Sequence, residues 1–178
     1  MSSKINVLEI IKGHIGTVSD GGRSFFWDVV TFYIFPLIVS LSGILLAFDL
    51  PEETISLLVN FSAIFTALLL SVLVLVYEQE SRLEINKKTD ELYSVKKALL
   101  KDLYYNICFS IVSSLFLVVV CLLHSIMRKK YISIEIMDFS VNVSISTFLL
   151  TPIALFVVVS LMLTILMIVK RMHTLLTC

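Results

Sequence analysis

Four long runs without a charged residue place the strongest constraint on how this chain folds. The runs hold 20, 24, 25 and 31 of the 178 residues: Val29–Phe48, Thr54–Tyr77, Leu103–Met127 and Phe139–Val169. About 20 apolar residues are enough for a helix to cross the hydrocarbon core of a bilayer. Hydrophobic residues make up 58% of the chain and charged residues only 16%, whereas soluble domains average about 45–50% and about 25%. The sequence therefore predicts an all-α membrane protein with four transmembrane helices.

The last of these runs is too long for one span, and its beginning has a different pattern. Apolar and polar residues alternate in 131–137 and again in 140–146, and period two is typical of extended chain. We therefore expect a small β-hairpin there, supported by the bundle or a neighbouring subunit because isolated hairpins are marginal in water. The predicted segments are a lead (1–27), spans at 28–48, 55–77, 103–127 and 147–169, outer links at 49–54 and 128–146, a helical hairpin (78–102) and a tail (170–178).

The lead is amphipathic. Ile5, Leu8, Ile11 and Ile15 recur at helical spacing among charged residues, which favours a helix lying in the lipid headgroup region. A frayed terminus is the alternative. Paired glycines at 21–22 then end the pattern, because such pairs favour a turn.

The distribution of basic residues predicts the orientation. If both termini are inside, the inner segments hold 11 Lys and Arg residues and the outer ones hold three, Arg128, Lys129 and Lys130. Segments rich in Lys and Arg stay in the cytoplasm, so we expect both termini and the hairpin there. The three outer basic residues are interpreted as side chains that snorkel at a helix end.

Small and polar residues in the spans are candidates for packing between helices, because small side chains let helix backbones approach closely in lipid. We expect Pro36 to kink the first span and Asp28 to cap it. Asn60 and Asn106 lie toward opposite membrane faces, so each should bond a helix, a backbone carbonyl or water at its own depth. The candidate packing residues are Asp28, Pro36, Ser40, Gly43, Asn60, Asn106, Ser110 and Ser113.

The segment Glu78–Asp102 is the one long polar stretch. Its six basic and six acidic residues balance, so it is not a polybasic patch for lipid or nucleic acid. A turn at 86–89 followed by leucine and valine at steps of three and four predicts that the two neighbouring spans project from the membrane as a helical hairpin. The hairpin either packs on itself or serves as a docking platform for a cytosolic protein or another subunit. The candidate docking residues are Glu78, Glu80, Arg82, Glu84, Lys87, Lys88, Asp90, Glu91, Lys96 and Lys97.

No residue pattern indicates a reaction. The middle of each span lacks Asp, Glu, Lys and Arg, the groups that mark ion-coupled transport. The sequence has no Gly-rich phosphate loop and no constellation with metal-ligand spacing. We therefore predict no enzyme activity, no cofactor, no metal and no direct binding of nucleic acid.

The size, the four-span layout, the lead Gly21–Asp28 into a first span with Pro36, and the charged central hairpin resemble the small membrane subunit of the bacterial Kiwa anti-phage defence system. The resemblance implies an inner-membrane homo-oligomer, a tetramer, that senses disturbance of the envelope by phage and works with a cytosolic DNA-binding partner. It supplies no catalytic residues. The first hypothesis is thus a non-enzymatic oligomeric sensor or scaffold that docks a cytosolic effector. The alternatives are an oligomeric pore or channel and, third, a small-molecule transporter.

Overall fold

The computed structural model describes residues 7–18, 25–46, 49–87, 91–128 and 146–177, and the backbone alone of 131–136 and 139–144. Within these ranges, four helical segments are long and apolar enough to cross a membrane. The prediction of four membrane-crossing helices is confirmed, and the chain has the character of a multi-pass membrane protein.

The first membrane-crossing segment joins α2 (Phe25–Val29), the π-helical turn η1 (Val30–Ile34) and α3 (Phe35–Leu45). The proline ring at 36 would clash with the carbonyl of Phe32 in a regular α-helix. The chain avoids this clash by widening the preceding turn, so that Phe35 N–H donates to the carbonyl of Val30, five residues back. The same arrangement recurs where η2 (Ser146–Leu150) precedes Pro152.

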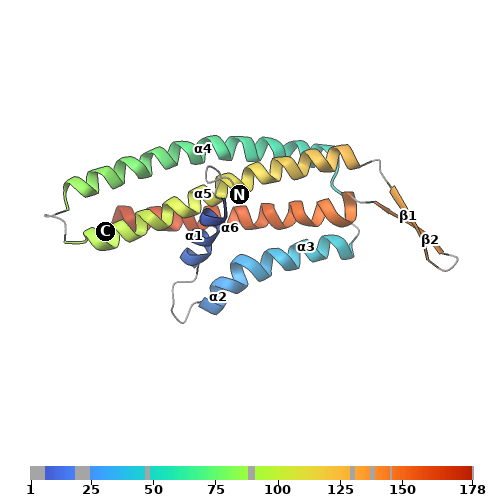
Figure 1. Cartoon of the computed structure of the whole chain (residues 1–178), viewed down its shortest axis with the longest axis horizontal. Helices are drawn as coiled ribbons and strands as arrows, with labels where there is room; N and C mark the ends of the chain where they lie inside the picture. Colours follow the sequence, from blue (N-terminus) through green and yellow to red (C-terminus); the bar gives the residue numbers. More distant parts are fainter. Residues whose placement is uncertain are drawn as a thin grey trace.

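Helices α4 (Glu52–Ile85, 34 residues) and α5 (Tyr93–Met127, 35 residues) lie side by side along the longest axis of the molecule (Figure 1). At 1.5 Å per residue each is about 50 Å long, whereas the hydrocarbon core of a bilayer is about 30 Å thick. Both helices are therefore long enough to cross a bilayer and continue for several turns beyond it. Glu52 and Glu53 in the first turn of α4 suit the positive end of its helix dipole.

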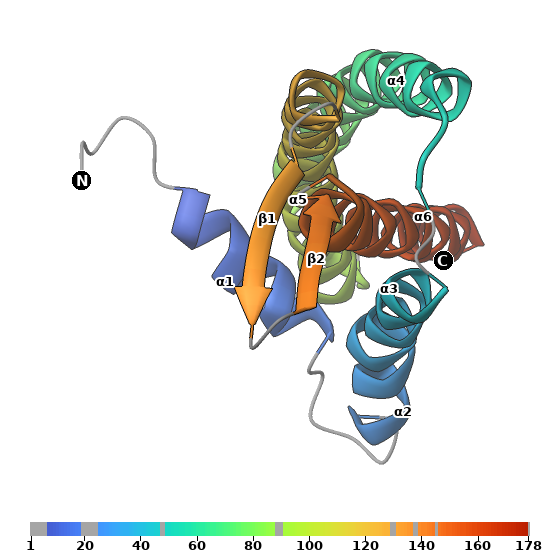
Figure 2. The same ribbon diagram turned by 90° about the vertical axis from the view of Figure 1, so that its right-hand side faces the viewer.

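Helix α6 (Thr151–Thr177) completes an open row in the order α4, α5, α6, α3 (Figure 2). Leu117, Val120 and Cys121 of α5 pack with Ala154 and Val157 of α6 in one apolar cluster. A second cluster joins the other ends of α4, α5 and α6. The two inner helices of the row are the better buried, and many large apolar side chains of α3 and α4 remain exposed.

Strands β1 (Tyr131–Ile136) and β2 (Phe139–Ser144) pair antiparallel, with Tyr131 opposite Ser144 and Ile136 opposite Phe139. They lie between α5 and η2, at the end of the molecule opposite the turn between α4 and α5 (Figure 1). We call these two ends the strand end and the hairpin end.

Helix α1 (Val7–Val18) lies outside the row and packs against α5 (Figure 2). Its apolar stripe is divided: Leu8 is 54% and Ile15 is 47% exposed, whereas Ile11 lines a cavity together with Phe109 of α5. His14, Thr17 and Val18 are buried. Leu8 and Ile15 are therefore available to lipid, as a helix in the headgroup region requires.

Several boundaries differ from those predicted. Helix α6 continues through the segment predicted as a tail, because Leu175 packs on the apolar cluster at the hairpin end and the Thr174 and Thr177 hydroxyls donate to carbonyls of their own helix. Asp28 is the fourth residue of α2 and not its N-cap. Of the turn predicted at 86–89, residues 88 and 89 lie outside the described residues.

Candidate functional site

The tip of the hairpin is held by a cluster that joins its two arms. Glu84 near the end of α4 accepts hydrogen bonds from the Tyr93 hydroxyl, at 2.8 Å, and from the Lys97 ammonium, both on α5. Lys97 also donates to the Tyr93 hydroxyl at 3.1 Å, and the Lys87 ammonium lies 5.5 Å from the centroid of the Tyr93 ring. These contacts hold the ends of α4 and α5 together.

The charges in this cluster stabilise one another's ionised forms. Hydrogen bonds from Lys97 and Tyr93 lower the pKa of the Glu84 carboxyl, and the hydrogen bond to Glu84 raises the pKa of the Lys97 amine. The contribution of Glu84 to the stability of the fold is present at neutral pH and is lost as the pH falls through its lowered pKa. The contribution of Lys97 to stability is lost as the pH rises through its raised pKa. Both side chains are about half exposed, so water and salt screen the pair.

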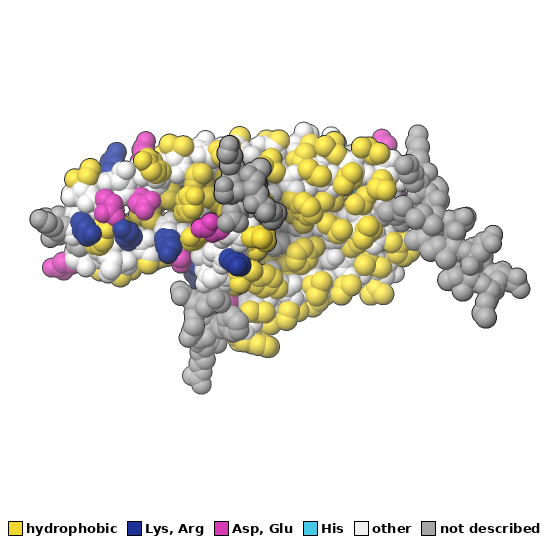
Figure 3. All heavy atoms as spheres, in the orientation of Figure 1, with side chains coloured by type: hydrophobic (Ala, Val, Ile, Leu, Met, Phe, Trp, Pro, Cys, Tyr) yellow, Lys and Arg dark blue, Asp and Glu magenta, His cyan; other side chains and the backbone are white. Residues whose placement is uncertain are grey.

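Most other candidate docking residues are exposed along the same stretch: Glu78, Glu80, Arg82, Lys87 and Glu91. Lys96 is half-buried, and Lys88 and Asp90 lie outside the described residues. Arg82 and Lys96 line an open cavity of about 300 Å³ that also includes Leu175 of α6. Figure 3 shows most of the charged side chains of this face gathered at the hairpin end, while apolar and uncharged side chains cover most of the rest of the face.

A buried polar cluster fixes α1 to α5. Asn106 of α5 is fully buried, and its Oδ1 accepts a hydrogen bond from His14 Nδ1 at 2.8 Å. The Thr17 hydroxyl lies 2.8 Å from the same Oδ1 and 2.7 Å from the carbonyl of His14, so its single proton serves one acceptor at a time. The His14 ring stacks on Phe109, with centroids 3.8 Å apart. We call His14, Thr17 and Asn106, together with Asp102 and Arg171, the α1 cluster.

Arg171 brings α6 into the α1 cluster. Its Nη2 donates to the carbonyl of Thr17 at 2.8 Å. Its Nη1 lies 3.2 Å from Asp102 Oδ2, close enough for an ion pair but outside hydrogen-bond geometry. The cluster therefore joins three helices, α1 to α5 through buried hydrogen bonds and α6 to both through partly buried contacts.

Burial lowers the pKa of the His14 imidazole; the hydrogen bond to Asn106 opposes this effect, and the charge of Arg171 adds to it. The unfolded chain thus binds a proton more readily than the folded chain. The contribution of His14 to the stability of the fold is present above the ordinary pKa of histidine, 6.5, and is lost as the pH falls below that value.

The structure places the candidate packing residues in different surroundings. Pro36, Ser40 and Gly43 are buried on the face of α3 toward α6, where the Ser40 hydroxyl donates to the carbonyl of Pro152 at 2.7 Å. A Cβ on Gly43 would lie 2.7 Å from Leu155 Cδ1, so glycine allows this close approach.

The remaining packing candidates are not brought together. Asn106 bonds α1, as described, and the hydroxyl of the buried Ser110 has no hydrogen-bond partner among the described residues. Ser113 lines an apolar cavity between α1, α5 and α6, and Asp28 lines another between α1, η1 and α6. Asn60 is exposed on α4.

A second polar group, at the strand end, was missed by the sequence reasoning. His124 is fully buried, and its Nε2 lies 3.1 Å from the Thr151 hydroxyl and 3.7 Å from Asp49 Oδ1. Arg128 lies 3.9 Å from Asp49 and 3.3 Å from Glu52. Arg128 therefore forms ion pairs with acidic residues of the link 49–54, in addition to any snorkelling of its side chain. The four-span topology places that link and Arg128 on one membrane face, which is the signal that could have found this group.

The described ranges contain no group of three or more His, Cys, Asp and Glu side chains that could hold a metal ion. The chemistry of the polar groups is thus hydrogen bonding and ion pairing between helices, and the hairpin offers exposed charges of both signs. Comparisons of the chain with family models, curated proteins and solved structures give no match.

Proposed function

We propose that this protein is a non-enzymatic, oligomeric membrane sensor or scaffold that docks a cytosolic effector through the hairpin Glu78–Asp102. The observation that carries the proposal is the separation of surfaces in Figure 3, where exposed charges gather at the hairpin end beyond an apolar row. Exposed charges of both signs provide orientation and selectivity in a protein contact more than raw affinity. The resemblance to the Kiwa membrane subunit supports a role in anti-phage defence at the bacterial inner membrane.

The proposed orientation places the hairpin end in the cytoplasm. The Lys and Arg residues of α1, the hairpin and the end of α6 lie toward this end, and such residues favour the inner face. Trp27 and Tyr77 are 68% and 69% exposed near the same boundary, as expected of interfacial aromatic residues.

The orientation can be tested by labelling single cysteines in a chain whose own cysteines are replaced by serine. Glu53→Cys, at the strand end, should react with a membrane-impermeant maleimide in spheroplasts. Glu80→Cys, in the hairpin, should react only after the membrane is permeabilised. Both residues are exposed, so access from each side decides the result, and the reverse pattern would contradict the proposed orientation.

Docking can be tested by neutralising exposed charges outside the Glu84 cluster. The triple variant Glu78→Gln, Glu80→Gln, Arg82→Gln should reduce capture of a soluble protein by a photo-crosslinker placed at Glu91 by about 10-fold or more, because complementary charges orient such a contact. The adduct is identified by mass spectrometry.

Glu53→Gln, at the strand end, is the matched control and should leave capture unchanged. A stronger variant replaces Glu78–Asp102 by an uncharged flexible linker of equal length that carries the crosslinker at position 91, with the labelling of Glu53→Cys as the check on insertion. Undiminished capture of the soluble protein by the linker variant would contradict the docking proposal.

One observation favours the alternative of an oligomeric pore. A stripe of small and polar residues on α4 is exposed at steps of three and four: Ser56, Asn60, Ala63, Ala67 and Ser71. Such a stripe suits either close helix packing between subunits or the lining of a pore. Ion leak from liposomes that contain the purified protein, abolished by Asn60→Leu, would favour the pore; tight liposomes would favour subunit packing.

A further inference from the structure

A cavity of about 380 Å³ lies between α1, η1 and α6, away from the hairpin and next to the α1 cluster, whose Thr17 and Arg171 are among its lining residues. Its lining has two parts. The polar lining residues include Lys170, Arg171 and Asp28, which we call the rim. The apolar ones include Phe32, Leu163 and the 65% exposed Leu166, which we call the floor. An occupant that satisfies both parts must itself be amphipathic.

The depth of the cavity in a bilayer follows from the sequence. Lys170 is the first charged residue after the long uncharged run that ends at Val169, and Asp28 immediately precedes the run that begins at Val29. The rim therefore lies where two spans leave the hydrocarbon core, and the floor lies within it. The exposed Trp27 next to Asp28 marks the same boundary. Lipid phosphates lie at this depth.

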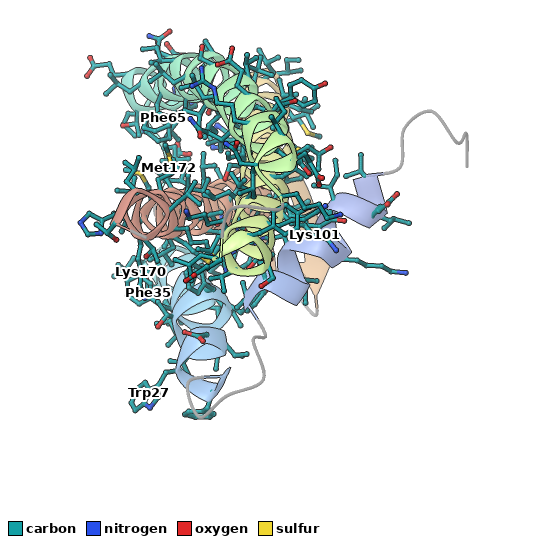
Figure 4. All side chains as sticks on the ribbon, turned by 90° about the vertical axis from the view of Figure 1, so that its left-hand side faces the viewer. Trp27, Phe35, Phe65, Lys101, Lys170 and Met172 are labelled. Atoms are coloured by element: carbon teal, nitrogen blue, oxygen red, sulfur yellow. The ribbon has the colours of Figure 1, made fainter. Side chains whose placement is uncertain are left out.

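The two basic residues of the rim are in different situations. Arg171 is held by the Thr17 carbonyl and by Asp102. Lys170 is exposed, and its ammonium makes no hydrogen bond or ion pair with the part of the chain that the structure describes. Figure 4 shows Lys170 on the side of α6 toward the helix that carries Phe35, whereas Lys101 lies on the other side of the row near α1. Lys170 is thus the group positioned to contact an anionic ligand at this cavity.

We propose that the cavity binds a membrane phospholipid, with the phosphate at Lys170 beside Arg171 and the acyl chain along Phe32, Leu163 and Leu166. The phosphate oxygens accept hydrogen bonds from the ammonium, and this charge-assisted contact is strengthened at the edge of the hydrocarbon region. Bound lipid fills the space between α6, η1 and α1. This site does not depend on the proposed docking of an effector.

Native mass spectrometry of the whole protein, released from nanodiscs of phosphatidylglycerol, tests the proposal. We expect the wild type to retain lipid and Lys170→Ala to retain about five-fold less or lower still. This factor corresponds to the binding free energy that one Lys contributes near an anionic membrane surface. Lys101→Ala, an exposed lysine at the same end of the molecule, should retain lipid as the wild type does. Equal retention by Lys170→Ala and wild type would overturn the proposal.

Further experiments test the acyl chain and the phosphate of the ligand separately. Leu163→Trp fills the floor without changing charge, and it should also lower retention; unchanged retention would contradict the placement of the acyl chain. Nanodiscs of monoglucosyldiacylglycerol supply the chains without a phosphate and should give little retained lipid. Glycerophosphate supplies the phosphate without chains, and if it binds alone as well as the lipid does, the ligand is a free phosphate compound and the proposal is wrong.

Discussion

Replacing Gly13 with alanine should release α1 from α5. A Cβ at this position would lie 2.2 Å from Tyr105 Cδ1 and 2.7 Å from Cγ, so the clash involves the base of the ring as well as its far edge. Overpacking of this kind costs about 1–3 kcal/mol. Amide hydrogen exchange in α1 should therefore accelerate by about 10-fold or more, since about 1.4 kcal/mol corresponds to a factor of ten.

Gly16→Ala is the matched control. No atom lies within 4 Å of a Cβ built at Gly16, and alanine is a better helix former than glycine by about 0.8–1 kcal/mol. Both substitutions raise the intrinsic helicity of α1, yet only the one at Gly13 should loosen it. If Gly13→Ala slows exchange as Gly16→Ala does, the close packing of α1 on Tyr105 is not what holds the helix.

The second large effect should come from Asn106→Leu. This change removes the acceptor of His14 Nδ1 and of the Thr17 hydroxyl, and a buried polar group left unsatisfied costs about 1–3 kcal/mol. We expect a decrease of that size in the free energy of unfolding, measured by steric trapping in bicelles. Exchange in α1 should accelerate at the same time.

Ser114→Ala is the comparison for Asn106→Leu. The Ser114 hydroxyl lies 2.6 Å from the Thr66 hydroxyl of α4, and each also lies within hydrogen-bond distance of a carbonyl of its own helix, so two protons serve three contacts. Interhelical hydrogen bonds in membranes average about 0.6 kcal/mol, and Thr66 keeps its own-helix acceptor. Losses of equal size for the two variants would contradict a contribution of the Asn106 contacts larger than that of an ordinary interhelical hydrogen bond.

The four spans could be predicted because hydropathy and length suffice to identify a membrane-crossing helix. The rotation of each helix about its axis could not. The amphipathic pattern of α1 predicted a helix in the headgroup region, but not that Leu8 and Ile15 would face outward while His14 packs on α5. Lipid is as apolar as the stripe, so hydrophobicity does not decide which face meets a neighbouring helix.

Contacts between distant segments were the other part beyond prediction. Asn106 was expected to bond a helix, a carbonyl or water at its own depth. The residues that flank Asn106 in the sequence do not indicate that its partner is His14, 92 residues away. For His124 and Asp49 the four-span topology indicates a shared membrane face but not the contact itself. Small residues were more informative: Ser40 and Gly43 lie on the stripe where the structure has α6, since a close approach of backbones leaves a visible pattern in composition.

The open row of helices restricts how copies of this chain can associate. Its two ends differ, because α4 bounds one and α3 the other (Figure 2). Both helices expose apolar side chains. Contact between two α4 faces would be isologous and would stop at a dimer. Contact of α4 with α3 of the next copy would be heterologous and would leave one unused end of each kind, so that it continues until a ring closes. The number of subunits then depends on the angle between the two end faces of a single chain.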